Sequence, residues 1–117
     1  MKIFDSFAWF EYFAGSARGK KADDILRSKE TLATPASCVA EIKRKRIREK
    51  MDWRSEISFI KTQSAVLPLT EQIALRAGEI SELHFADALV YATALEHNAT
   101  LVTGDAHFKN LPNVEMI

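Results

Sequence analysis

Five short apolar runs, separated by longer stretches with helical spacing, limit most strongly how this chain can fold. The runs are rich in Ile, Val, Leu and Thr, which is typical of buried parallel strands. Their alternation with helical patterns predicts βαβ units. We therefore expect a three-layer α/β/α sandwich around a mostly parallel sheet of about five strands. The predicted strands are Lys2 to Asp5, Thr31 to Thr34, Ala65 to Leu69, Thr100 to Thr103 and Val114 to Ile117.

About six helices are predicted between these strands. Ser37 and Asp52 are the expected N-caps of the third and fourth helices, and Thr70 is that of the fifth. Asn98 should end the sixth helix in a left-handed conformation. The segment from Gly15 to Lys21 is expected to be an exposed turn. The predicted helices span Ser6 to Ala14, Ala22 to Ser28, Ser37 to about Lys50, a stretch after Asp52, a stretch after Thr70, and about Phe85 to His97.

Length and composition indicate an ordinary globular chain. Its 117 residues suit one domain, residues 1–117, and 47% of them are apolar. No run approaches the roughly 20 apolar residues of a membrane span, and no signal peptide is recognisable, so we expect a cytoplasmic protein. The formal net charge is zero and does not by itself indicate a nucleic-acid partner.

Cysteine and histidine usage narrows the metal chemistry. Cys38 is the only cysteine, which excludes an internal disulfide and a thiolate zinc site, and a buried packing role is expected for it. The three histidines form no ligand pair at helical spacing. We expect His84, His97 and His107 to be surface or capping residues rather than metal ligands.

Four acidic residues stand where strands end or helices begin. Asp5 closes the first predicted strand, and Asp105 follows the fourth after a single glycine. Glu41 falls in the first turns of a helix that follows another strand. Asp87 occupies a helix that is apolar around almost its whole circumference, where an ionised carboxylate needs compensation. Because ligands bind at the carboxyl edge of parallel sheets, we expect these four side chains to converge there.

Converging carboxylates repel each other and raise one another's pKa values. A divalent cation removes this conflict, and oxygen ligands favour Mg²⁺ or Mn²⁺. Such a centre activates water and polarises phosphoryl oxygens, which is the chemistry of phosphodiester hydrolysis.

The segments from Ile3 to Phe13, Ala86 to Ala94 and Leu101 to Phe108 resemble the signature blocks of PIN domains, most closely those of VapC-type toxins. The resemblance implies a Mg²⁺-dependent endoribonuclease that is often a homodimer and is inhibited by a cognate antitoxin. It implies catalytic and metal-binding roles for Asp5, Glu41, Asp87 and Asp105. Thr103 matches the family's Ser or Thr near the metal, and Ser6 is a further supporting candidate. The connection at 77–85 is shorter than usual in the family.

A basic run follows Glu41 in the third predicted helix. Arg44, Lys45 and Arg48 lie three, four and seven positions after Glu41 and therefore share its face. Contacts to RNA phosphates and a plain solvated face both remain open as interpretations.

Two other functions compete with the ribonuclease. A signalling receiver domain needs an acidic pair after the first strand and a phospho-acceptor Asp after the third. This chain has Asp5-Ser6 and Leu69-Thr70 at those places, which disfavours it. A catalytically inactive PIN-like module that binds RNA or protein stays open as the alternative.

Overall fold

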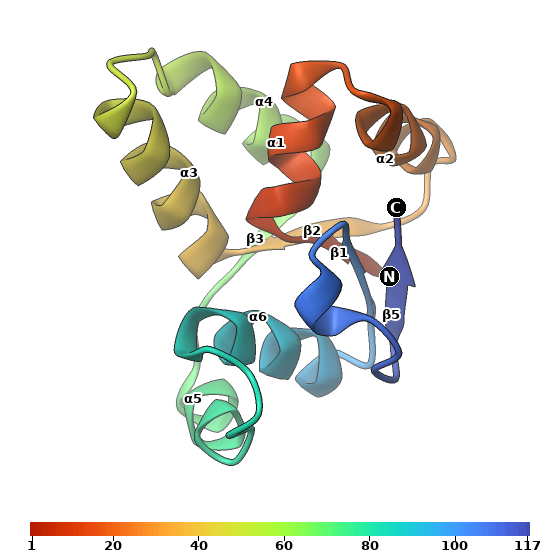
Figure 1. Ribbon diagram of the computed structural model, residues 1–117, viewed down its shortest axis with the longest axis vertical. Coiled ribbons are helices and arrows are strands. Elements are labelled where there is room, and N and C mark those ends of the chain that lie inside the picture. The colour runs from red at the N-terminus through yellow and green to blue at the C-terminus, as the bar shows by residue number, and fades with distance from the viewer.

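The computed structural model describes residues 1–117 and places five strands in one sheet between two layers of helices (Figure 1). The strand order is β3-β2-β1-β4-β5, and every neighbouring pair is parallel. The predicted α/β/α sandwich is therefore confirmed. The strands are β1 (Lys2–Phe4), β2 (Leu32–Pro35), β3 (Ala65–Leu67), β4 (Thr100–Thr103) and β5 (Val114–Met116).

The helices divide between the two faces of the sheet (Figure 1). The upper layer in Figure 1 holds α1 (Ser6–Ala14), α2 (Ala17–Arg27), α3 (Ala36–Arg48) and α4 (Arg54–Gln63). The lower layer holds α5 (Glu71–Gly78), α6 (Phe85–Glu96) and the short 3-10 helix η1 (Ala106–Phe108). No helix has both the length and the apolar character that a membrane span requires.

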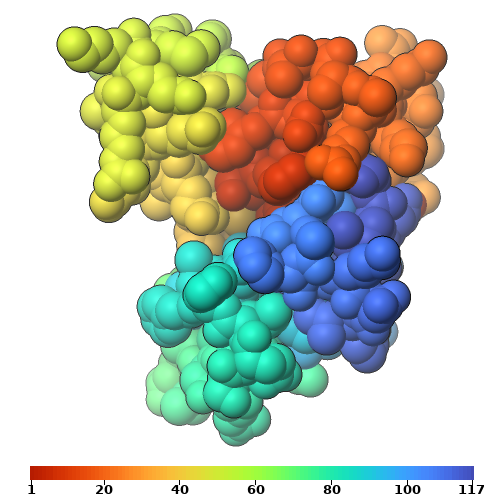
Figure 2. Space-filling view, viewed as in Figure 1, coloured from red at the N-terminus to blue at the C-terminus, as the bar shows by residue number.

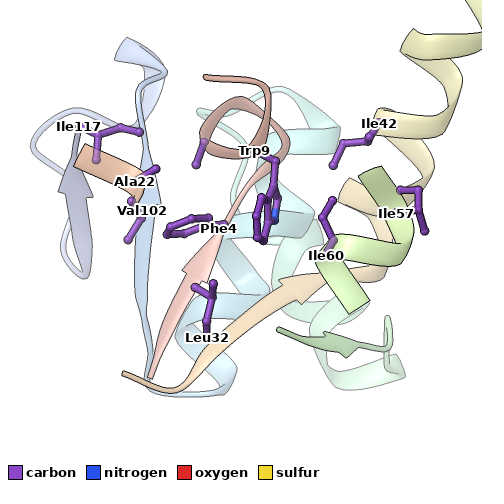
Figure 3. Packing of buried hydrophobic residues seen from close by; sticks show 10 residues of the cluster. Phe4, Trp9, Ala22, Leu32, Ile42, Ile57, Ile60, Val102 and Ile117 are labelled. Atoms are coloured by element: carbon purple, nitrogen blue, oxygen red, sulfur yellow. The ribbon is translucent and has the colours of Figure 1, made fainter. Parts of the chain in front are cut away.

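The three central strands β1, β2 and β4 each contribute to a core on both faces, because successive side chains of a strand point in opposite directions. In β1, Ile3 joins the core beneath α6, whereas Phe4 joins the core beneath α1. Figure 3 shows Phe4 and Trp9 at the centre of the latter core. The indole Nε1 of Trp9 donates a hydrogen bond to Oγ1 of Thr34 at 3.0 Å, so this large side chain is buried without an unpaired polar atom.

The starts of two helices differ from the sequence prediction. Ser37 is not an N-cap, because β2 runs directly into α3 and Pro35 takes the cap position. Proline suits the start of a helix, where it lacks only an N–H that would have no intrahelical partner. Asp52 lies one residue before the N-cap of α4, which is Trp53, although its carboxylate still accepts a hydrogen bond from the Arg54 N–H at 3.1 Å.

The prediction of an exposed turn from Gly15 to Lys21 is also wrong. Helix α2 begins at Ala17, and the Ser16 side chain caps it by accepting a hydrogen bond from the Gly19 N–H. Gly19 is buried because α1 and α2 approach closely, and a Cβ at this position would lie 2.0 Å from the carbonyl oxygen of Glu11. A glycine inside a helix therefore serves helix packing here.

Other local predictions are confirmed. Thr70 caps α5 by accepting a hydrogen bond from the Ile73 N–H at 3.2 Å. Asn98 follows α6 with a φ of 48°, in the left-handed region. Cys38 is fully buried.

Candidate metal centre and adjoining groove

The four predicted acidic residues belong to the carboxyl edge of the sheet or to the helices beside it. The chain moves from β1 outward to β2 and β3, and then returns to place β4 on the other side of β1. Phe4 pairs in register with Val102, so the carboxyl ends of β1 and β4 are adjacent. Asp5 directly follows β1, and Asp105 follows β4 after Gly104. This reversal of strand order is where open parallel sheets bind ligands.

Asp5 is the most enclosed of the four carboxylates. Its side chain is nearly buried and caps α1 by accepting a hydrogen bond from the Ala8 N–H at 2.8 Å. The Thr103 hydroxyl also hydrogen bonds to it. The pKa of Asp5 is raised to about 7, mainly by burial and also by the neighbouring charges of Asp105 and Glu41, although the two hydrogen bonds lower it.

Glu41 and Asp87 approach the same place from opposite helical layers. Glu41 is half-buried on α3 and accepts a hydrogen bond from the Ser6 hydroxyl at 3.3 Å. Asp87 is half-buried in the first turn of α6. Burial raises both pKa values; the Asp87 charge further raises that of Glu41, and the Asp105 charge further raises that of Asp87. Each of the four acids is therefore electrostatically coupled to others of the group.

Asp105 brings a histidine into this acidic group. Its carboxylate caps η1 by accepting a hydrogen bond from the His107 N–H at 2.9 Å, and it lies 2.8 Å from Nδ1 of the same residue. Asp87, Asp105 and His107 each offer one ligand atom within 4.8 Å of the others, an arrangement that could hold a metal ion. The expectation that His107 is a surface residue is confirmed, since its side chain is 62% exposed, and the structure adds that it lies beside two of the acids. The spacing of two residues between Asp105 and His107 is the sequence signal that could have placed His107 beside this group.

A divalent cation suits this donor set. The charges that shift the pKa values of Asp5, Glu41 and Asp87 come from other carboxylates and from histidines, not from lysine or arginine. No lysine or arginine is thus among the charges that set the pKa values of these three acids. Several hard oxygen donors with one available imidazole fit Mg²⁺ or Mn²⁺.

A basic groove opens beside the acids. This hollow of about 450 Å³ connects the acidic edge with the exposed face of α3. The prediction that three basic side chains share the face of Glu41 is confirmed, since all line the same hollow. The residues of the basic groove are Ser6, Phe10, Glu41, Arg44, Lys45, Arg48 and Glu49.

Arg46 belongs to the same basic run but faces another way. Its side chain is buried, and its guanidinium contacts Glu56 of α4 at 2.6 and 3.2 Å and Glu49 at 3.1 Å. It also lies over the ring of Phe10, 5.0 Å from the centroid. Arg46 therefore joins α3 to α4, whereas the three basic residues of the groove are exposed.

Residues 2–114 match the family model of the PIN domain, so the match spans nearly the whole chain. This chain belongs to the PIN domain family. The resemblance inferred from the three sequence blocks is thereby confirmed. A search of curated proteins returned no significant match.

Solved structures of the family share this fold at low sequence identity. A toxin–antitoxin complex from Klebsiella pneumoniae matches with a TM-score of 0.81 and 20% identity, covering 99% of this chain and 97% of that one. VapC20 of Mycobacterium tuberculosis, a Sarcin-Ricin loop cleaving toxin, matches with a TM-score of 0.76 and 18% identity. The match covers 96% of this chain and 95% of that one. VapBC2 from Rickettsia felis, bound to a promoter DNA fragment, matches with a TM-score of 0.74 and 16% identity. The match covers 99% of this chain and 96% of that one.

Proposed function

We propose that this PIN domain is a metal-dependent endoribonuclease and the toxin of a toxin–antitoxin pair. The observation that carries the proposal is the coupling of four carboxylates from four separate segments at the carboxyl edge of one sheet. Membership of the PIN family supports a nuclease, and the toxin–antitoxin structures with the same fold support the biological role.

In this proposal Asp5, Glu41, Asp87 and Asp105 hold Mg²⁺ or Mn²⁺. When bound, the cation supplies the positive charge that activates water and polarises the RNA phosphodiester. The protein fixes the ligands in advance. Ser6 orients Glu41 through its hydroxyl, and Thr103 restrains Asp5 while its Oγ1 accepts a hydrogen bond from the Asp105 N–H at 3.0 Å. Such restraint lowers the reorganisation required during reaction.

The basic groove is the proposed path of the RNA backbone. Arg44, Lys45 and Arg48 carry positive charge next to Ser6 and Glu41, at the border of the acidic group. Cationic side chains at that place favour binding of phosphates on either side of the scissile bond. They also offset the repulsion between RNA and the four carboxylates.

The proposed partners are a cognate antitoxin and a second copy of the chain. The solved relatives from Klebsiella pneumoniae, Rickettsia felis and Salmonella typhimurium are toxin–antitoxin or VapBC assemblies, which supports an antitoxin for this chain. Homodimer formation and a cytoplasmic location complete the proposal. A PIN-like module that binds RNA or protein without cleaving is the competing function.

A cleavage assay with purified protein and RNA separates these two functions. The ribonuclease should cut RNA when Mg²⁺ or Mn²⁺ is added and should stop when a chelator removes the ion. The inactive module should retain RNA on a filter without shortening it under either condition. Persistent binding with no cleavage in the presence of both ions would replace the proposed nuclease with that module.

A further inference from the structure

A second hollow adjoins the acidic group from the side opposite the basic groove. Its volume is about 240 Å³, and its walls come from the segment before α6 and from η1. In Figure 2 these parts of the chain are the teal and blue atoms that meet near the middle of the molecule. We name it the histidine hollow. It is lined by Ser81, Glu82, Leu83, His84 and His107.

His107 joins this hollow to the candidate metal centre. Its Nδ1 lies 2.8 Å from Asp105, while its ring packs edge-on against that of His84 with centroids 5.5 Å apart. The imidazole is therefore a shared wall between the carboxylates and the hollow. A group held in the hollow would lie next to any phosphodiester placed at the acids.

The chemistry of the hollow favours a flat, uncharged ligand. Glu82 lines it, and Asp87 and Asp105 lie just beyond His107, so a phosphate would meet unfavourable charge. Two imidazole rings and Leu83 provide the surfaces on which a planar ring can pack. Single-stranded RNA is recognised by stacking its bases on aromatic side chains, histidine included, and by hydrogen bonds to base edges.

We propose that the histidine hollow is a nucleobase subsite that selects bases bearing an amino group. The proposal rests on the proposed ribonuclease function and adds a specificity site to it. The Glu82 carboxylate accepts hydrogen bonds but cannot donate them when ionised. Guanine, adenine and cytosine present amino donors, whereas uracil presents a carbonyl in place of the amino group of cytosine. RNA phosphates then occupy the basic groove, and one base beside the cleaved bond occupies the histidine hollow.

Free nucleosides test the subsite without any cleavage, because they contain no phosphodiester. Imidazole NMR signals of the metal-free protein would be followed during titration with guanosine, adenosine, cytidine and uridine. We expect His84 and His107 to shift with the three amino-bearing nucleosides and much less with uridine. His97, at the far end of α6, should remain unchanged and serves as an internal reference. Equal shifts with all four nucleosides, or none at millimolar concentration, would overturn the proposal.

Glu82→Gln probes the selecting group, and Glu79→Gln is its matched control. Glu79 is three residues away and also exposed, but it lines a different hollow. Glu82→Gln should weaken binding of the amino-bearing nucleosides about tenfold, because a neutral amide oxygen accepts a weaker hydrogen bond than a charged carboxylate does. Glu79→Gln should leave it unchanged. An equal effect of both changes would reduce the role of Glu82 to general surface charge and contradict the proposal.

Sequencing of cleaved RNA ends provides a readout in the reaction itself. Glu82→Gln should lose the preference for amino-bearing bases beside the cleavage point, whereas Glu79→Gln should keep both that preference and the cleavage rate. An unchanged base preference would contradict the subsite but not the ribonuclease. If the unaltered protein cuts no RNA, the proposed function fails, and the nucleoside titration still decides whether the hollow binds bases.

Discussion

Asp105 contacts His107 twice, through the backbone N–H at 2.9 Å and through Nδ1 at 2.8 Å. The two contacts fix the carboxylate on the short turn that follows β4. They also keep an imidazole nitrogen within 4.8 Å of a carboxylate oxygen of Asp87. The orientation of Asp105 thus depends on a side chain two positions further along the chain.

His107→Ala should weaken metal binding and RNA cleavage about 10–100-fold, the usual cost of losing a group that orients a metal ligand. The protein should stay folded, because the His107 side chain is 62% exposed. The increase in melting temperature with added Mn²⁺ measures the binding. His97→Ala, on an exposed residue at the other end of α6, is the matched control. If Mn²⁺ raised the melting temperature equally in the unaltered protein, His107→Ala and His97→Ala, His107 would have no role in metal binding.

The stability of the metal-free protein should fall as pH rises from 3.8 to about 7. Asp5 has an ordinary pKa of 3.8 when unfolded and about 7 when folded, so the folded protein holds a proton that the unfolded chain releases. The resulting loss of stability across this window is at most about 4 kcal/mol. Raised pKa values of Glu41 and Asp87 act in the same direction.

Asp5→Asn should flatten this pH dependence without removing the helix cap, because the amide oxygen can still accept from the Ala8 N–H. Urea unfolding at several pH values measures the effect. Addition of Mg²⁺ should restore stability near neutral pH in the unaltered protein. A pH profile that is the same for Asp5→Asn and the unaltered protein would show that Asp5 does not carry the effect.

Two arginines of the basic run should behave differently. Arg46→Ala should cost about 3–5 kcal/mol of unfolding free energy, because it leaves Glu56 without its partner in a largely buried pair. Arg44→Ala should change stability by less than about 0.5 kcal/mol, as is usual at an exposed site. Denaturant titration compares them directly. A small effect of Arg46→Ala would show that its contacts to α4 do not stabilise the fold.

The basic groove should contribute to RNA affinity in a salt-dependent way. Changing Arg44, Lys45 and Arg48 together to Ala should reduce the slope of log affinity against log salt by about 2, since each phosphate contact to single-stranded RNA contributes about 0.7. The control changes three exposed helical lysines of other surfaces, Lys20, Lys21 and Lys61. Binding measured with a catalytically impaired Asp87→Asn background avoids cleavage. If both triple variants showed the same slope of log affinity against log salt, the basic groove would not contact RNA phosphates.

Periodicity and strand chemistry predicted the sheet, the helix order and the acidic edge. Asp5 and Asp105 were located because parallel strands bring their carboxyl ends together, whatever their separation in sequence. The face shared by Glu41 and Arg44 followed from helical spacing alone. These features depend on local pattern and on one general rule of sheet architecture.

What the sequence missed depends on tertiary contacts. Arg46 is indistinguishable from its basic neighbours until Glu56 of α4 packs against it. Gly19 was interpreted as part of a turn, because the local sequence pattern does not indicate that α1 packs closely against this residue. His107 joined the acidic group only because η1 folds its imidazole back onto Asp105, beside α6.

The central claim is that four carboxylates act as one metal-holding unit that cleaves RNA. Its most direct test is the Mg²⁺-dependent cleavage rate of Asp87→Asn, Asp105→Asn and the double variant, each first shown to be folded. Residues that act as a unit are strongly non-additive. Each single change should reduce the rate by about 10³ or more, and the double change should cost little beyond either one. Cleavage by folded Asp87→Asn at the rate of the unaltered protein would contradict the account.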